Sequence, residues 1–242
     1  MRHRSLAALL ALGLAAQPLA AQEPSPGERL PVVKYVLPNG KTFLFLRREG
    51  APTVSFVTQF RAGGVDEWTG ISGTAHLFEH MLFKGTPTLG TRDYAAEQRM
   101  FPRIDAVADS LTAEFRKGGA ADSITLRRLR DRLHQLEDSA RQYVVSNELD
   151  RVLTRNGAVR LNASTFSGGT NYFFALPSNR SELWFVLEAD RIRNPVLREF
   201  YSERDVVMEE RRLRVETQPF GMLSEEFLQA AFRAHPYGRP VV

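Results

Sequence analysis

The first part of the chain carries short apolar runs of the length that β-strands have. Residues 32–36 and 42–46 are two such runs, and Asn39-Gly40 between them is a strong signal for a tight hairpin. Residues 54–60 form a third run. Two more runs, 161–165 and 171–177, flank a turn at Gly168-Gly169. The pattern predicts a mostly antiparallel sheet.

A helical period replaces this pattern between the third and the fourth run. Apolar residues recur at steps of three and four along 91–117 and again along 123–143, with a break at Gly118-Gly119. The first stripe consists of Ile104, Val107, Leu111 and Phe115. Two amphipathic helices about a glycine break form an antiparallel hairpin, which we expect at about 98–155, with His134 on its surface. Further helices at 182–192, 197–215 and 223–232 give an α+β fold, in which helices back the sheet and the helical hairpin is an insertion.

Residues 73–83 hold the most specific chemistry of the chain. They are expected to form a helix that Ser72 or Thr74 caps and that Gly85 ends. His76 and His80 are four residues apart and therefore share one face, so both imidazoles can reach a single metal ion. Glu79 lies on the same flank, close enough to act on a water bound to that metal without being a ligand.

Zinc suits this set of side chains. It accepts histidine nitrogens and carboxylate oxygens, and a catalytic zinc site uses three protein ligands with the fourth position left to water. The order H-x-x-E-H is an inverzincin signature. The alternative is a helix face that carries two histidines and a glutamate without a metal. The apolar neighbours at 77, 78 and 81–83 predict a buried helix, where imidazoles and a carboxylate need partners.

The predicted helix 197–215 is expected to bring the third ligand. Glu203, Val207 and Glu210 fall on one of its faces, and Glu209 points about 100° away from Glu210. Carboxylates on an apolar helix face are costly unless they are paired or bound to a metal. Glu210 is therefore the best third ligand, and Glu203 is placed to orient a histidine from behind. A solvated helix with ion pairs along its surface is the alternative, and for Glu203 the two interpretations are equally good.

The first 31 residues are predicted to lie outside the folded domain. Residues 1–21 have the basic start, the apolar run and the small residues of a signal peptide, with cleavage before Gln22, and 22–31 form a flexible lead-in. An N-terminal membrane anchor is the alternative. The protein is thus expected to be exported, periplasmic or secreted, without a membrane span in the mature chain. The net charge is +4, and no concentrated stripe of Lys and Arg indicates nucleic acid as a partner.

Three separated motifs in this order resemble the pitrilysin family of zinc peptidases, which includes insulysin and the mitochondrial processing peptidase. They are residues 73–86, then Asn162-Ala163-Ser164-Thr165, then residues 203–210. The resemblance implies Zn²⁺ held by His76, His80 and Glu210, with Glu79 as the general base and Glu203 as the family's second acidic position. It also implies that Asn162 and Ala163 contact the backbone of a peptide or unfolded protein substrate. From the residues alone, 162–165 form a short edge strand that either receives an extended peptide or is an ordinary hairpin edge.

The resemblance also sets expectations about the rest of the protein. Family members consist of two similar halves with substrate between them, so a second homologous half or subunit is an expected partner. Residues 32–242 are expected to be an incomplete N-terminal peptidase domain, interrupted by the helical hairpin. The function implied is that of a zinc endopeptidase. One alternative is a non-catalytic or half-site partner subunit that binds peptide; another is a structural metal site closed by His235 as a fourth ligand.

Overall fold

A computed structural model describes residues 30–241 of the chain, and these residues fall into two compact units, 30–50 and 51–241. The first unit holds a hairpin of β1 (Val32–Val36) and β2 (Thr42–Leu46), paired antiparallel. Gly40 takes the left-handed conformation that the turn needs, with φ of 84°. The predicted hairpin is therefore confirmed. The predicted signal peptide and most of the lead-in lie outside the described residues.

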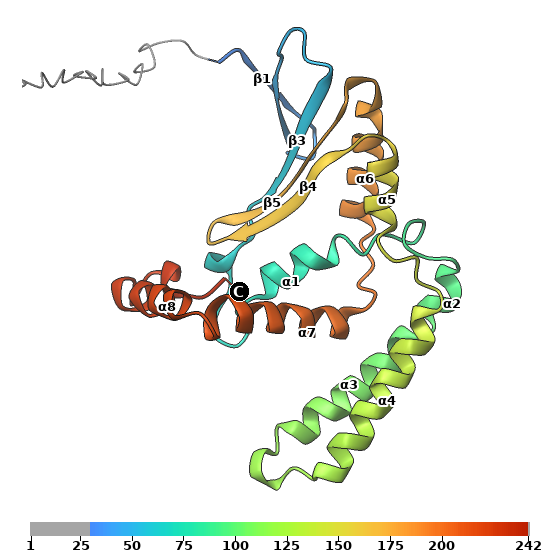
Figure 1. The fold of residues 1–242 in the computed structure, drawn as a ribbon, viewed down its shortest axis with the longest axis vertical. Helices are drawn as coiled ribbons and strands as arrows, with labels where there is room; N and C mark the ends of the chain where they lie inside the picture. Colours follow the sequence, from blue (N-terminus) through green and yellow to red (C-terminus); the bar gives the residue numbers. More distant parts are fainter. Residues whose placement is uncertain (1–29, 242) are drawn as a thin grey trace, which may run out of the picture. The chain divides into compact units, whose positions relative to one another are not determined.

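The second unit contains a three-stranded antiparallel sheet in the order β3-β5-β4. The strands are β3 (Thr53–Phe60), β4 (Val159–Phe166) and β5 (Gly169–Pro177) (Figure 1). The central strand β5 is mostly buried, and Leu176 at its end is fully buried. The antiparallel sheet predicted from the apolar runs is confirmed, and β4 is an edge strand of the described sheet.

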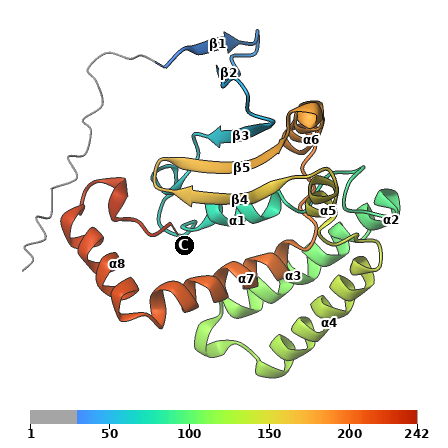
Figure 2. The same cartoon turned by 45° about the horizontal axis from the view of Figure 1, so that its top comes forward.

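Two helices that are far apart in the sequence lie side by side next to this sheet. They are α1 (Thr74–Met81) and α7 (Phe200–Arg211), which contact each other, and α1 also contacts β4 and β5 (Figure 1 and Figure 2). The helix predicted at 197–215 starts later than predicted, and its last turn is π-helical instead of α-helical. Glu199 has a left-handed φ of 59° and starts α7 late, and residues Arg212–Glu216 form a wider π-helical turn. Helix α8 (Pro219–Ala231) follows.

The predicted helical hairpin is present as α3 (Phe101–Phe115) and α4 (Ser123–Arg141). Its core contains Met100, Ile104, Ala108, Leu133, Leu136 and Ala140. Phe115 belongs to the predicted stripe but is 64% exposed, because α3 ends there at the tip of the hairpin. Short helices α2 (Tyr94–Gln98) and α5 (Glu148–Arg155) flank the hairpin, and α6 (Ser181–Arg193) stacks Trp184 on Phe56 of β3. Within residues 30–241, no helix has the length and apolar character needed to cross a membrane.

Candidate metal centre

Helix α1 is fixed at its start by a side chain that the sequence did not single out. Its N-cap residue is Gly73, with φ of 86°, and not Ser72 or Thr74. The carboxylate of Glu67, which is 5% exposed, accepts hydrogen bonds from the backbone N–H groups of Gly73 (2.8 Å) and Ala75 (2.6 Å). A carboxylate at this end also suits the helix dipole. The preceding loop therefore sets the position of the histidine-bearing helix.

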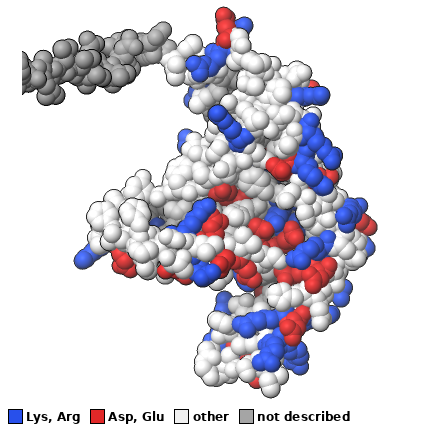
Figure 3. All heavy atoms as spheres, viewed as in Figure 1, with Lys and Arg blue, Asp and Glu red and all other residues white. Residues whose placement is uncertain are grey.

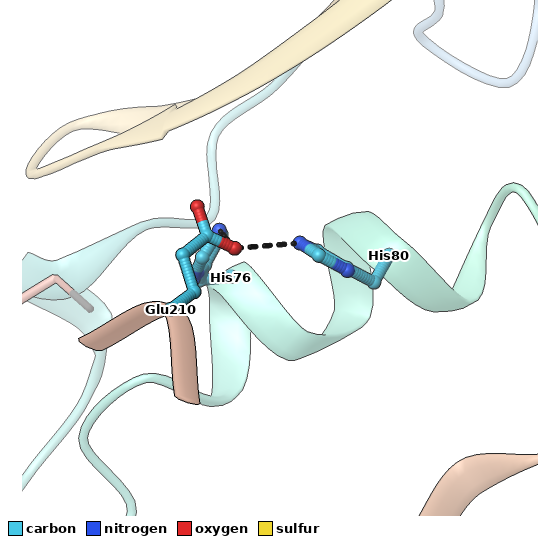
Figure 4. Close-up of side chains that lie close together, drawn as sticks. All are labelled: His76, His80 and Glu210. Atoms are coloured by element: carbon cyan, nitrogen blue, oxygen red, sulfur yellow. Dashed lines mark ion pairs between the residues drawn. The ribbon is translucent and has the colours of Figure 1, made fainter. Parts of the chain in front are cut away.

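The structure brings His76, His80 and Glu210 together (Figure 4). Glu210 Oε2 lies 3.8 Å from His76 Nε2 and 3.5 Å from His80 Nε2, and the three ligand atoms all lie within 4.8 Å of one another. Two ligands about 2.0–2.1 Å from a tetrahedral zinc ion would be separated by roughly 3.3 Å. The observed spacing is close to that value. The donor set therefore fits a zinc ion.

The ring of His80 is oriented from behind by Glu203. His80 Nδ1 donates to Glu203 Oε2 at 3.2 Å, which leaves Nε2 as the acceptor nitrogen that faces Glu210. Lys84 Nζ lies 2.5 Å from the other oxygen of Glu203. The bond from His80, reinforced by Lys84, lowers the pKa of Glu203 to about 2, although burial opposes the shift. Glu203 is therefore an anion in the arrangement that holds His80.

His76 is the more buried of the two histidines, with 5% of its surface exposed. Burial lowers its pKa, which favours the neutral imidazole that a metal requires. Among the described residues, His76 Nδ1 has no hydrogen-bond partner, whereas His76 Nε2 lies 3.8 Å from Glu210 Oε2. Nε2 of His76 is therefore the ring nitrogen that faces Glu210.

Glu79 lies beside the cluster and is held by the sheet. Its Oε2 accepts a hydrogen bond of 2.5 Å from the hydroxyl of Thr165 on β4. The Thr165 hydroxyl also lies 3.3 Å from the hydroxyl of Thr170 on β5, which donates to the carbonyl of Ala62. Only 8% of the surface of Glu79 is exposed, so few water molecules compete with Thr165 for its carboxylate. The bond from Thr165 therefore holds the carboxylate in one orientation.

A cavity of about 520 Å³ opens next to Glu79 and His80. Asn162 and Ala163 of β4 form part of its wall, together with Phe83 and Lys84. Asn162 is exposed, and its side-chain oxygen accepts from the N–H of Ala163 at 2.9 Å. The two residues predicted to contact substrate therefore lie at the same cavity as the predicted base. Their substrate role stays a prediction.

A buried arginine fixes the segment that follows α1. All five N–H groups of Arg198 are used: two bond the carboxylate of Glu97, and the others bond the carbonyls of Lys84, Thr86 and Leu89. Arg198 and Glu97 are 1% and 0% exposed. Because Arg198 directly precedes α7, this cage ties the end of the histidine helix to the start of the glutamate helix. Nothing in the local sequence distinguishes Arg198 from the many exposed arginines of the chain.

Three other residues considered in the sequence analysis, Glu209, His134 and His235, lie outside the metal cluster. Glu209 is half exposed and pairs with Arg212, whereas Glu210 is 19% exposed and places Oε2 at the histidines and Oε1 at 2.6 Å from Arg214 Nη1. The side chain of His134 is 68% exposed and lies on the hairpin. His235 accepts from the N–H of Tyr237 and packs on its ring, and it is outside the one group of three metal-ligating side chains found in residues 30–241. A fourth protein ligand from His235 is therefore not present in this arrangement.

Comparison with known proteins gives consistent results. The sequence model of the family described as Insulinase (Peptidase family M16) matches residues 43–101. The zinc protease PqqE of Helicobacter pylori is 30% identical over 180 residues, which is 74% of this chain and 28% of that protein. An uncharacterised zinc protease of Mycobacterium leprae is 27% identical over 213 residues, 87% of this chain and 35% of its own. The crystal structure of a protease from Helicobacter pylori aligns with a TM-score of 0.60 at 25% identity, covering 86% of this chain and 37% of that one.

The antiparallel sheet, the adjacent helix with two histidines and the glutamate from a second helix are the features of a metalloprotease domain. The family match and the relatives, all named zinc proteases, agree with that class. Over residues 43–101 the chain is similar to the insulinase family of peptidases, and it spans about a third or less of the length of the curated relatives described here.

Proposed function

We propose that this chain is a zinc-dependent endopeptidase domain that hydrolyses peptides or unfolded polypeptides. The observation that carries the proposal is the convergence of His76, His80 and Glu210, with Glu79 next to them. Two neutral imidazoles and one carboxylate are the ligand set of a catalytic zinc site, and no fourth protein ligand belongs to the group within the described residues. The zinc protease names of the relatives support the same assignment.

In this proposal Glu79, Thr165 and Glu203 have separate roles in the reaction. When bound, zinc supplies a Lewis acid that lowers the pKa of water towards neutrality and polarises a peptide carbonyl. Glu79 accepts the proton from the attacking water and later gives it to the amine that leaves. Thr165 keeps the carboxylate of Glu79 in one orientation, and Glu203 keeps His80 in the tautomer whose Nε2 faces inward.

We propose that the substrate binds as an extended strand along the edge strand β4. Among the described residues β4 pairs only with β5, so its other edge can donate and accept backbone hydrogen bonds. Asn162 and Ala163 lie on this strand at the cavity next to Glu79. Hydrogen bonds between the backbone of β4 and the backbone of the substrate would bind unfolded segments with little dependence on their side chains.

Two further parts of the proposal concern the whole protein. A second homologous half or subunit is proposed to complete the substrate chamber, in line with the greater length of the relatives. Export to the periplasm or the medium is proposed from residues 1–21. N-terminal sequencing of protein recovered from those compartments tests this part, and a start at residue 1 would contradict it.

The metal site is tested by zinc content and zinc affinity. Glu210→Gln, His76→Ala and His80→Ala are expected to lower zinc binding by at least a hundredfold. Glu209→Gln is the matched control, because this neighbouring glutamate is half exposed and faces Arg212 instead of the histidines. Equal zinc affinity in the Glu209 and Glu210 variants would refute the ligand assignment.

Catalysis is tested separately with Glu79→Gln. This variant is expected to keep one zinc per chain and to lose cleavage of unstructured peptides, measured with and without a supplied second half. Normal turnover by the variant would refute the role of Glu79. Zinc binding without any cleavage by the native chain in either format would instead favour the alternative, a non-catalytic partner subunit.

A further inference from the structure

A second cavity lies at the base of the helical hairpin; it shares Val144, Arg198 and Glu199 with the cavity at Glu79, but no histidine lines it. Its volume is about 310 Å³, within the range of small-molecule sites. Helices α3 and α4 form one side, and the start of α7 forms the other. We call it the hairpin-base cavity. No residue predicted to hold metal or substrate lines it.

The walls of this cavity combine apolar surface with carboxylates. Phe101, Ile104, Ala140 and Val144 give it an apolar floor, and the aromatic rings of Phe200 and Tyr201 stand at its side. This surface suits the apolar body of a ligand. The aromatic faces also attract a cation that approaches within about 6 Å.

The charges of the lining are unbalanced towards negative. Arg198 and Glu97 also line the cavity, but they are bound to each other in the buried cage described above. Apart from this pair, the lining contains the carboxylates of Asp105, Glu137 and Glu199 and one guanidinium, that of Arg141, which contacts Glu199. Asp105 accepts from the hydroxyl of Tyr201, and Glu137 accepts from the hydroxyl of Ser202. Lys84, which does not line the cavity, adds a second positive group at Glu199, so the carboxylates still exceed the cations and favour a ligand that carries a positive charge.

One of these carboxylates is shared with the metal centre. Glu199 Oε1 lies 3.5 Å from Arg141 Nε, and its Oε2 lies 3.1 Å from Lys84 Nζ. Lys84 in turn contacts Glu203, the residue that orients His80. Glu199 also has a left-handed backbone, with φ of 59°, which is costly for a residue with a side chain and is common at functional sites. Figure 3 shows acidic and basic side chains interleaved over this middle part of the molecule.

We propose that the hairpin-base cavity binds a small organic cation with an apolar body, and that the bound cation competes with Arg141 for Glu199. The competition frees Glu199 to change its contact with Lys84. A change at Lys84 reaches Glu203 and thus the metal centre, so the cavity would act as an effector site. Binding itself is independent of the peptidase proposal, whereas the coupling rests on its metal site.

The binding experiment uses 2-phenylethylamine as the probe, with the whole chain in an isothermal titration. Neutral 2-phenylethanol and anionic 3-phenylpropanoate are probes of matched shape. The amine is expected to bind at least tenfold more tightly than either. Asp105→Asn and Glu137→Gln are each expected to weaken amine binding three- to tenfold. Asp131→Asn, an exposed aspartate of α4 that does not line the cavity, is the matched control and should have no effect.

Three results would overturn the site: no saturable binding of the amine up to 10 mM, equal affinity for the amine and the alcohol, or equal weakening by Asp131→Asn. Both Asp105 and Asp131 are exposed, so their variants are expected to fold. Coupling is measured as the zinc dissociation constant with and without saturating amine, which should differ at least threefold. The difference should disappear in the double variant Asp105→Asn with Glu137→Gln. An unchanged zinc constant in the native chain would refute the coupling, and a chain that binds amine but no zinc would refute the metal site instead.

Discussion

Replacing Arg198 by methionine should destabilise the protein more than any surface change, because Arg198 closes a cage around the segment after α1. The variant keeps a long apolar stem but removes the charge and all five N–H donors. Glu97, which has no exposed surface, then stays buried without its partner. Removing one member of a buried ion pair costs about 3–5 kcal/mol. The carbonyl of Lys84 loses the donor that it has among the described residues, and the carbonyls of Thr86 and Leu89 keep only their backbone bonds to each other.

The size of this effect can be measured by urea and thermal unfolding of the metal-free chain. For a protein of this length a loss of about 3–5 kcal/mol lowers the midpoint of thermal unfolding by roughly 6–20 °C. A double variant, Arg198→Met with Glu97→Leu, should recover part of the loss because it removes the uncompensated charge. Recovery should be incomplete, since the three backbone carbonyls each still lack the hydrogen bond from Arg198.

The control is Arg212→Met, which removes an arginine from an exposed pair with Glu209 and should not change stability measurably. The reasoning would be refuted if Arg198→Met lost less than about 1 kcal/mol, a value typical of exposed ion pairs. It would also be refuted if the double variant were as unstable as the single one, because the cost would then not come from the unpaired carboxylate.

Three further predictions concern the metal centre. Thr165→Val removes the hydroxyl that holds Glu79, so kcat should fall at least tenfold while KM and zinc affinity stay the same. Thr165→Ser keeps the hydroxyl and should restore kcat. A change confined to KM would argue against a positioning role for Thr165. Glu203→Gln weakens the partner of His80 and should lower zinc affinity about 10- to 100-fold, measured by competition with a chelator, whereas an unchanged affinity would mean that His80 is oriented by other contacts. Because the bond from His80 lowers the pKa of Glu203 from 4.5 to about 2, the stability that Glu203 contributes should be complete above pH 4.5 and disappear as the pH falls towards 2. The difference in unfolding free energy between the metal-free native chain and Glu203→Gln should accordingly shrink from pH 5 to pH 3, and a constant difference would contradict the shifted pKa.

The parts of the site that depend on local periodicity could be predicted from the sequence. His76 and His80 share a face because they are four residues apart on a helix, and Glu210 rather than Glu209 faces them because of the same period in α7. The strands and the helical hairpin follow from equally local patterns. These features need no knowledge of which segments meet in space.

The parts that depend on distant contacts could not be predicted in this way. Glu67 caps α1 from the preceding loop, and Thr165 reaches Glu79 from a strand 86 positions later. Thr165 belongs to the motif 162–165 that predicts the edge strand. The family resemblance implies substrate contact for Asn162 and Ala163 of this motif, but it implies no role for Thr165. The end of the predicted helix at 197 failed because Glu199 adopts a left-handed backbone, which its side-chain type does not indicate.

The helical hairpin shows why a metal centre can be assembled from helices so far apart in the sequence. Glu203 and His80 are separated by 123 positions. The hairpin occupies much of that interval, yet its two ends are joined to each other: Thr91 and Val144 form a β-bridge, Arg92 N–H bonds the carbonyl of Tyr143 at 2.7 Å, and Val145 N–H bonds the carbonyl of Gly90 at 3.0 Å. Closing a loop becomes only slightly more costly as the loop lengthens, by about 0.6 kcal/mol for each doubling. Because Gly90 and Val145 are already hydrogen-bonded to each other, the residues between them add even less to the entropic cost of bringing α1 and α7 together. The spacing of α1 and α7 is then set by contacts outside the hairpin, above all by Arg198 and the carbonyls of the segment from Lys84 to Leu89.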